Sequence, residues 1–144
     1  MAFLKHTESF DRLNELAVKL DSKKESLGAA GLCHEQHVLA SVWTAVGVLE
    51  NGSFQYFSEC GLDAGRVAQA YERIGMREVA ALFNNADCIL RLVSNKPWNE
   101  RLTFLVEHER ELDGIAVEVL KHNEEAERKL LNYVHENAQA FRDL

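Results

Sequence analysis

Cys33-His34-Glu35-Gln36-His37 is the segment whose residue types come closest to a metal site. On a helix Cys33 and His37 lie one turn apart, and His34 is also a neighbour of His37. A zinc site needs three or four convergent ligands, and no second Cys/His pair of matching spacing occurs in the sequence. We interpret the segment as the polar start of a helix and predict no metal site.

Signatures of catalysis are missing from the sequence in their common forms. None of the six histidines has a glutamate three positions before it, as a ferritin-type di-iron site requires. Gly52-Ser53-Phe54 does not complete the Gly-x-Ser-x-Gly of a nucleophile elbow, and no glycine-rich phosphate loop is found. The sequence therefore predicts no catalytic residue and no cofactor. A small enzyme or ligand-binding protein with a pocket near Phe54, Tyr56 and His34 stays open as an alternative.

Acidic side chains crowd the C-terminal third. The chain has a net charge of −7, and residues 100–144 carry eleven acidic against six basic side chains. This balance argues against direct nucleic-acid binding, which needs clustered lysine and arginine, and it suits a basic protein partner. The residues that we predict to form an acidic partner-binding surface are Glu107, Glu109, Glu111, Asp113, Glu118, Glu124 and Glu125.

A second unusual segment is Asn51-Gly52-Ser53-Phe54-Gln55-Tyr56-Phe57, which places three aromatic residues directly after an Asn-Gly pair. Asn-Gly ends helices and also forms β-hairpin turns. Because the helical period upstream persists for three turns, we prefer a helix end. If a helix resumes, Phe54 and Phe57 face the core and the segment forms a corner between helices.

This segment resembles a motif of a widespread bacterial domain family of unknown function that includes a DNA-mimic protein. The family motif is Asn-Gly-Gly-Phe-x-Gln-(Phe/Tyr)-Phe. The matching residues are Asn51, Gly52, Phe54, Gln55, Tyr56 and Phe57. Ser53 replaces the second glycine, and the spacer before the glutamine is absent. A later family pattern is similar to the segment that ends in Ile74-Gly75. The resemblance covers about residues 36–144 and implies an all-α fold, a bacterial and cytoplasmic origin, and no catalytic residue.

The elements that must position these residues are helices. Apolar residues recur every three to four positions, which predicts helices over about 9–24, 34–50, 63–75, 77–93 and 99–112 and from 124 onward. Thr7 or Ser9, Asp63 and Asn99 are expected N-caps, and Asp113-Gly114 is an expected break. We therefore predict a single compact all-α domain of six to seven helices over residues 1–144, in which 1–35 form an N-terminal helix and linker.

The functional expectation is a non-catalytic protein-binding module of the cytoplasm that uses the acidic surface. A DNA mimic that competes for a DNA-binding protein is the alternative implied by the resemblance, and a homodimer stays open. The three cysteines are odd in number, which predicts reduced thiols. No apolar run approaches about 18 residues, so we expect no transmembrane helix.

Overall fold

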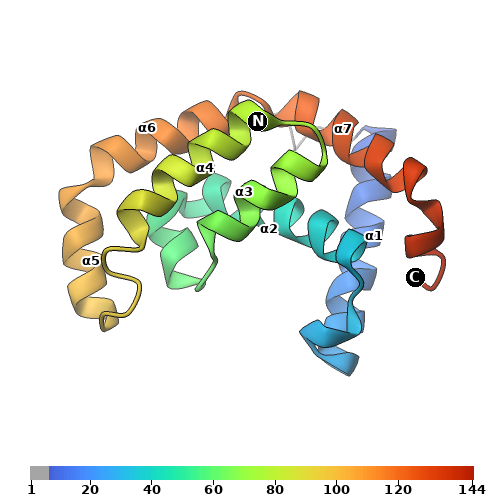
Figure 1. The fold of residues 1–144 in the computed structure, drawn as a ribbon, viewed down its shortest axis with the longest axis horizontal. Helices are drawn as coiled ribbons and strands as arrows, with labels where there is room; N and C mark the ends of the chain where they lie inside the picture. The colour runs from blue at the N-terminus through green and yellow to red at the C-terminus, as the bar shows by residue number, and fades with distance from the viewer. Residues whose placement is uncertain (1–6) are drawn as a thin grey trace.

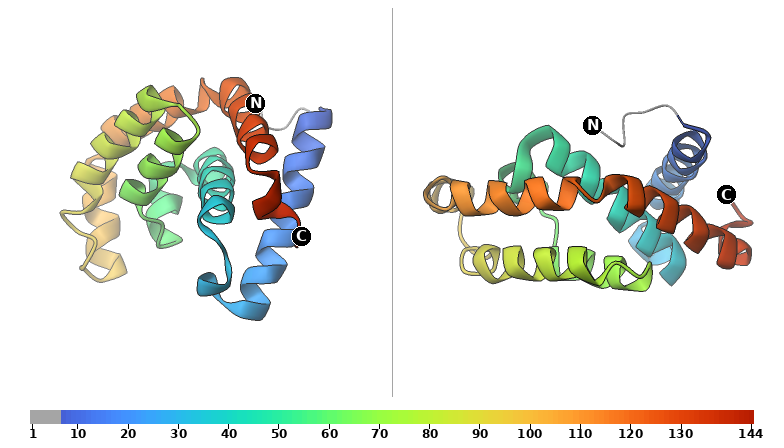
Figure 2. Two further views of the ribbon diagram at one scale, coloured as in Figure 1. Left: turned by 45° about the vertical axis from the view of Figure 1, so that its right-hand side comes forward. Right: turned by 90° about the horizontal axis from the view of Figure 1, so that it is seen from above.

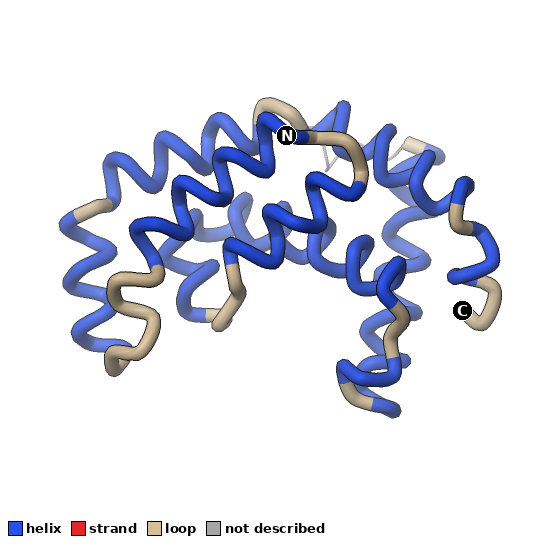
Figure 3. Tube along the Cα trace, in the orientation of Figure 1, coloured by secondary structure: helices blue, strands red, loops and turns tan. Residues whose placement is uncertain are grey.

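The computed structural model describes residues 7–144, and every regular element in that range is helical (Figure 3). The all-α prediction is therefore confirmed. The helices are α1 (Glu8–Leu27), α2 (His34–Glu59), α3 (Ala64–Arg73), α4 (Arg77–Leu90), α5 (Trp98–Glu107), α6 (Glu109–Leu120) and α7 (Asn123–Glu136), with 3₁₀ turns η2 (Ala29–Gly31) and η3 (Ala138–Phe141).

Helix α2 is the centre of the fold. It packs against α1, α3, α5, α6, α7 and η3, while α3 and α4 form an antiparallel pair in front of it (Figure 1). Seen from above, α6 and α7 follow one another across the top of the molecule (Figure 2). On this side of the molecule α4 contacts α6, and α1 contacts α7. The helices thus surround α2, as burial of its apolar residues requires.

Four aromatic rings fill the core where α2, α3 and α4 meet. Phe54, Phe57 and Phe83 are fully buried and Tyr71 is almost so. The Phe54 and Phe57 rings meet edge to face with centroids 5.3 Å apart, and Tyr71 stacks on Phe83 at 5.3 Å. These are the preferred geometries of aromatic pairs. The expectation that Phe54 and Phe57 face the core is confirmed.

Helix α1 begins at its predicted cap. The Thr7 hydroxyl accepts the Phe10 backbone N–H at 3.0 Å and donates to the Glu127 carboxylate at 2.7 Å. Leu13, Leu16 and Leu20 are buried along the inward face, as the periodicity predicts. The helix continues past the predicted end at residue 24 to Leu27, where Gly28 adopts a φ of 77° and turns the chain.

The Asn-Gly pair interrupts helix α2 without ending it. Gly52 (φ −167°, ψ 24°) and Ser53 (φ 55°, ψ −157°) are non-helical, and the helix then resumes to Glu59. The β-hairpin alternative is wrong, and the predicted stop is a kink. Burial of Phe54 and Phe57 explains the restart, because only a helical continuation places both rings on the core side.

Two boundaries in the C-terminal half differ from prediction. Pro97 rather than Asn99 is the N-cap of α5, and its carbonyl accepts the Arg101 N–H at 3.0 Å. Asp113-Gly114 is not a break, since α6 continues through it and Leu112 and Ala116 are buried on its inner face. The chain breaks at His108 instead, between α5 and α6.

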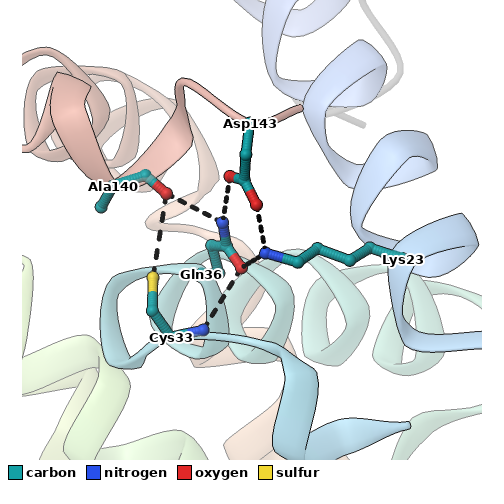
Figure 4. A network of polar contacts seen from close by, with 5 residues as sticks. All are labelled: Lys23, Cys33, Gln36, Ala140 and Asp143. Carbon is teal, nitrogen blue, oxygen red and sulfur yellow. Dashed lines mark hydrogen bonds and ion pairs between the residues drawn. The ribbon is translucent and has the colours of Figure 1, made fainter. Parts of the chain in front are cut away.

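A polar clasp joins the end of the chain to α1 and α2 (Figure 4). The buried Gln36 amide donates to the Ala140 carbonyl at 2.8 Å and to Asp143 Oδ1 at 3.0 Å. Its oxygen accepts from Lys23 Nζ at 3.0 Å and from the Cys33 N–H at 3.3 Å. Two donors and two lone pairs are the full capacity of a glutamine amide. The clasp therefore leaves no polar atom of this amide unpaired.

The clasp also has a defined pH dependence. Its hydrogen bond from Lys23 lowers the pKa of the Asp143 carboxyl below its ordinary value. A carboxyl whose pKa is lower in the folded state stabilises that state at neutral pH. This contribution is lost as the pH falls through the folded-state pKa, so acidification weakens the attachment of the C-terminal segment.

Replacing Gln36 with leucine is expected to lower the free energy of unfolding by about 1–2 kcal/mol. The change leaves the Cys33 N–H without its side-chain acceptor and removes the amide donor of the Ala140 carbonyl, which keeps a weaker contact from Cys33 Sγ at 3.8 Å. Urea unfolding followed by circular dichroism measures this change. Gln55→Leu is the control, since Gln55 is exposed and the expected change there is within about 0.5 kcal/mol. Equal stabilities for the two variants would contradict the role of the clasp.

Candidate functional site

Six of the seven predicted acidic residues fall into two groups toward the two ends of α6. Glu107, Glu109 and Glu111 surround the α5–α6 junction at one end of the long axis of the molecule (Figure 1). The second group, Glu118, Glu124 and Glu125, lies around the α6–α7 junction. Glu111 and Glu118, the nearest members of the two groups on α6, are seven residues apart, which is about 10.5 Å along the helix. Asp113 lies between them and is half-buried.

The group at the α6–α7 junction has structural partners. Lys121 Nζ donates to Glu118 at 2.7 Å, and this hydrogen bond lowers the pKa of the Glu118 carboxyl. Glu125 lies 3.7 Å from Lys129 Nζ. Glu124 and Glu125 also occupy the first turn of α7, where the helix dipole favours negative charge. Helix stability and ion pairing thus account for these carboxylates.

The group at the α5–α6 junction is different. Glu107, Glu109 and Glu111 are exposed, and within residues 7–144 none of them lies within 4.0 Å of a basic nitrogen. Glu109 and Glu111 occupy the first turn of α6, where the dipole favours them. Glu107 is the last residue of α5, where the dipole disfavours negative charge. We name these three residues the acidic end.

Two contacts fix the geometry of the acidic end. The His108 ring stacks on Phe104 with centroids 4.1 Å apart, and its Nδ1 lies 2.9 Å from the Phe104 carbonyl oxygen. Arg101 donates to the Ser58 carbonyl at 2.5 Å and lies 5.0 Å over the Trp98 ring. The first contact sets the bend between α5 and α6, and the second attaches α5 to the last part of α2. The acidic end is therefore held on a rigid corner.

The kink of α2 holds α6 as well. The Ser53 hydroxyl donates to the Asp113 carboxylate at 2.6 Å. Ser53 is the one residue among 7–144 other than glycine with a positive φ, which side chains with a Cβ rarely adopt. A strained residue persists when its surroundings fix it, and the hydrogen bond to Asp113 does so here. The kink thus couples the position of α6 to the backbone of α2.

Comparison with known families decides the identity of this scaffold. The model of the DMP19-like protein family matches residues 30–137, from within η2 through the end of α7. The chain belongs to the DMP19-like family. No curated protein matches the chain, and no solved structure does. Helix α1 and η3 lie outside the matched residues, so the clasp in Figure 4 joins the family domain to elements on both of its flanks.

The residues predicted to form the structural motif divide between core and surface in this DMP19-like chain. Phe54, Phe57 and Ile74 are buried. Asn51, Gln55 and Tyr56 are exposed, and the Asn51 amide donates to the Gly47 carbonyl at 2.8 Å. Gly75 has a φ of 81° and its carbonyl accepts from Lys129, so the turn between α3 and α4 is attached to α7.

The alternative of a pocket near Phe54, Tyr56 and His34 does not agree with the structure. The Phe54 ring is fully buried against Phe57 and Phe83, so this corner of the DMP19-like fold is filled. His34 lies in the first turn of α2, more than twenty residues before Tyr56. At 1.5 Å per residue the two are separated by roughly 30 Å along the helix. The helix predicted over 34–50 already separates His34 from its far end by about 24 Å, so the pocket alternative also conflicts with that prediction.

Three further expectations concerned metal sites, membrane-spanning helices and the cysteines. Within residues 7–144 no group of three or more His, Cys, Asp or Glu side chains could hold a metal ion. Over the same residues no helix combines the length and apolarity that crossing a bilayer demands. Cys33, Cys60 and Cys88 are exposed, and no disulfide joins them within residues 7–144; that they are reduced stays a prediction.

The structure also reveals a basic groove that the sequence interpretation missed. It is lined by Arg66, Gln69, Arg73 and Arg77 on one side and by the first turns of α2 on the other. Arg66, Gln69 and Arg73 follow the helical repeat of α3 with steps of three and four positions, and Arg77 comes just after the turn that ends this helix. That spacing is the signal in the sequence, although it identifies a shared face only once α3 and the start of α4 are known to adjoin α2.

Proposed function

We propose that this DMP19-like protein is a protein-binding module that presents the acidic end, Glu107, Glu109 and Glu111, to a basic surface of another protein. The observation that carries the proposal is Glu107. Its carboxylate is exposed, has no basic partner among the described residues, and lies at the end of α5 where the helix dipole disfavours it. Neither a basic side chain of the described residues nor the dipole of α5 stabilises this charge, whereas a basic partner would.

The rigidity of the corner supports the same function. A binding surface held by packed rings and hydrogen bonds loses little conformational entropy when the partner arrives. The Phe104–His108 stack and the attachments of α5 and α6 to α2 provide such a surface. Exposed charges of one sign also accelerate encounter with a partner of the opposite sign.

The test begins with capture. Proteins retained on the immobilised chain at low salt and released at high salt are identified, purified and titrated against three forms of the chain. The first is the wild type, the second is Glu107→Gln/Glu109→Gln/Glu111→Gln, and the third is Glu25→Gln/Glu59→Gln/Glu78→Gln. The third removes three exposed carboxylates elsewhere, so both variants have the same net charge. We expect the second form to bind about tenfold more weakly, a loss of about 1.4 kcal/mol, and the third to bind like the wild type.

Equal weakening by the two triple variants would mean that the net charge, and not the acidic end, attracts the partner. DNA mimicry is a narrower form of the proposal, and family membership favours it. It requires that the captured protein bind DNA and that the chain and DNA exclude one another, with a steep dependence on salt. A partner that binds both at once would exclude mimicry and leave the protein-binding module.

A further inference from the structure

A groove of about 690 Å³ runs between α2 and the α3–α4 turn, away from the acidic end. One wall carries His34, His37 and Ser41 from the first two turns of α2. The opposite wall carries Arg66, Gln69 and Arg73 from one face of α3, and Arg77 follows at the start of α4. In Figure 1 α3 and α4 lie in front of α2, whereas the α5–α6 junction lies at one end of the long axis.

The groove carries positive charge that the chain itself does not neutralise. Arg73 and Arg77 form no salt bridge within residues 7–144, and the nearest carboxylate oxygen to Arg66 belongs to the exposed Asp63 at 3.9 Å. Glu72 is the one acidic side chain among the lining residues. A local excess of arginine is thus maintained in a chain whose net charge is −7.

Helix stability does not explain two of these arginines. Arg77 is the first residue of α4, and Arg66 lies in the first turn of α3. A cation at the N-terminus of a helix is disfavoured by the dipole, in the same way as Glu107 at the C-terminus of α5. Arg73, at the end of α3, is the one member of the set that the dipole favours. The arginines of the groove therefore call for an anion from outside the chain.

We propose that the groove binds an acidic peptide segment of a second protein partner. Arg66 and Arg73 are seven residues apart on α3, which separates their Cα atoms by about 10.5 Å along the helix. In a polyproline II conformation, which has three residues per turn and a rise of 3.1 Å per residue, acidic residues at every third position share one face and recur about every 9 Å. The guanidinium group matches the carboxylate in a two-point hydrogen-bonded fork, which suits this partner chemistry.

A short peptide agrees with the charges better than a nucleic acid does. A long polyanion would bring many charges close to a molecule with a net charge of −7, and repulsion would oppose its approach. A peptide with two or three acidic residues delivers its charge within the groove alone. The buried Val38 and Ala70 also line the groove and add apolar surface between its polar residues.

The proposal is independent of the acidic end, because the two surfaces share no residue. A chain that uses both would connect a basic protein at the α5–α6 junction with an acidic segment at the groove. The Glu107→Gln/Glu109→Gln/Glu111→Gln variant is therefore expected to retain full binding at the groove. Loss of binding at the groove in this variant would overturn the assignment of two separate surfaces.

The experiment measures the fluorescence anisotropy of a labelled peptide with glutamate at every third position and neutral residues between. The full chain is compared with Arg66→Gln/Arg73→Gln/Arg77→Gln and with Arg12→Gln/Arg110→Gln/Arg142→Gln. The second triple variant removes three exposed arginines outside the groove and matches the net charge of the first. We expect the groove variant to bind at least about tenfold more weakly and the matched variant to stay within about twofold of the wild type.

Circular dichroism and urea unfolding of all three forms separate loss of binding from loss of folding. A peptide with glutamine in place of glutamate should not bind. Failure of the wild-type chain to bind the glutamate peptide, or equal weakening by both triple variants, would overturn the proposal. It would also be overturned if inorganic phosphate or a thymidine oligonucleotide bound more tightly than the peptide and depended on the same three arginines.

Discussion

Phe83→Ala is expected to lower the free energy of unfolding by about 3–5 kcal/mol. Phe83 is fully buried, and its ring lies 5.3 Å from Tyr71, 5.9 Å from Phe54 and 6.1 Å from Phe57. These partners come from α2 and α3, so the ring joins three helices. Removing it leaves a cavity that rigid aromatic neighbours cannot fill, which places the loss in the upper range for core substitutions.

Urea unfolding followed by circular dichroism measures this loss, and Leu92→Ala is the matched control. Leu92 follows α4 directly and is 64% exposed, so its replacement should change the stability by no more than about 0.5 kcal/mol. A loss below about 1 kcal/mol for Phe83→Ala would mean that the aromatic corner is loosely packed and that the kink of α2 is supported from elsewhere.

Gly52→Ala is expected to destabilise the protein by about 3 kcal/mol, the upper end of the range for overpacking. A Cβ on Gly52 would lie 2.5 Å from Tyr56 Cβ, an atom that no side-chain rotation can move away. The φ of −167° is open to any residue, so the loss comes from steric overlap and not from the backbone conformation. Relief requires movement of the second half of α2, to which Ser53 attaches α6.

Gly47→Ala in the same helix is the control, and it is expected to change the free energy of unfolding in the opposite direction. Nothing lies within 4 Å of a Cβ at Gly47, and alanine is the better helix former, so a gain of about 0.5–1 kcal/mol is expected. Both variants are compared with the wild type by urea unfolding. If both variants were more stable than the wild type, steric overlap with Tyr56 would not be what requires glycine at the kink.

The sequence predicts the helices well where burial follows a regular period, as with Leu13, Leu16 and Leu20 in α1. It fails where a tertiary contact overrides a local signal. Gly114 signals a break but lies inside α6, because the apolar neighbours on its inner face keep the helix continuous. The true break at His108 has no glycine or proline to mark it, since a ring stacked on Phe104 forms it.

The candidate site was only partly predictable, because it too depends on tertiary contacts that the local sequence does not show. Composition and charge identify the acidic residues, but they do not separate Glu118, which Lys121 neutralises, from Glu107, which has no basic partner among the described residues. That distinction depends on helix ends and on side-chain positions. Predicting the arginine groove from the sequence also requires the packing of α3 against α2, because the two walls of the groove are about thirty residues apart in the chain.

The attachment of α1 has a consequence for the order in which the chain acquires its structure. Thr7 reaches Glu127, and Lys23 reaches Asp143, each across 120 residues. A ribosome adding about 5–20 residues per second takes on the order of 10 s to deliver those partners. During that interval the leucine face of α1 lacks its final covering. Helix α1 therefore completes its contacts only after α7 and the segment that follows it have been synthesised, and chaperones have access to its leucine face until then.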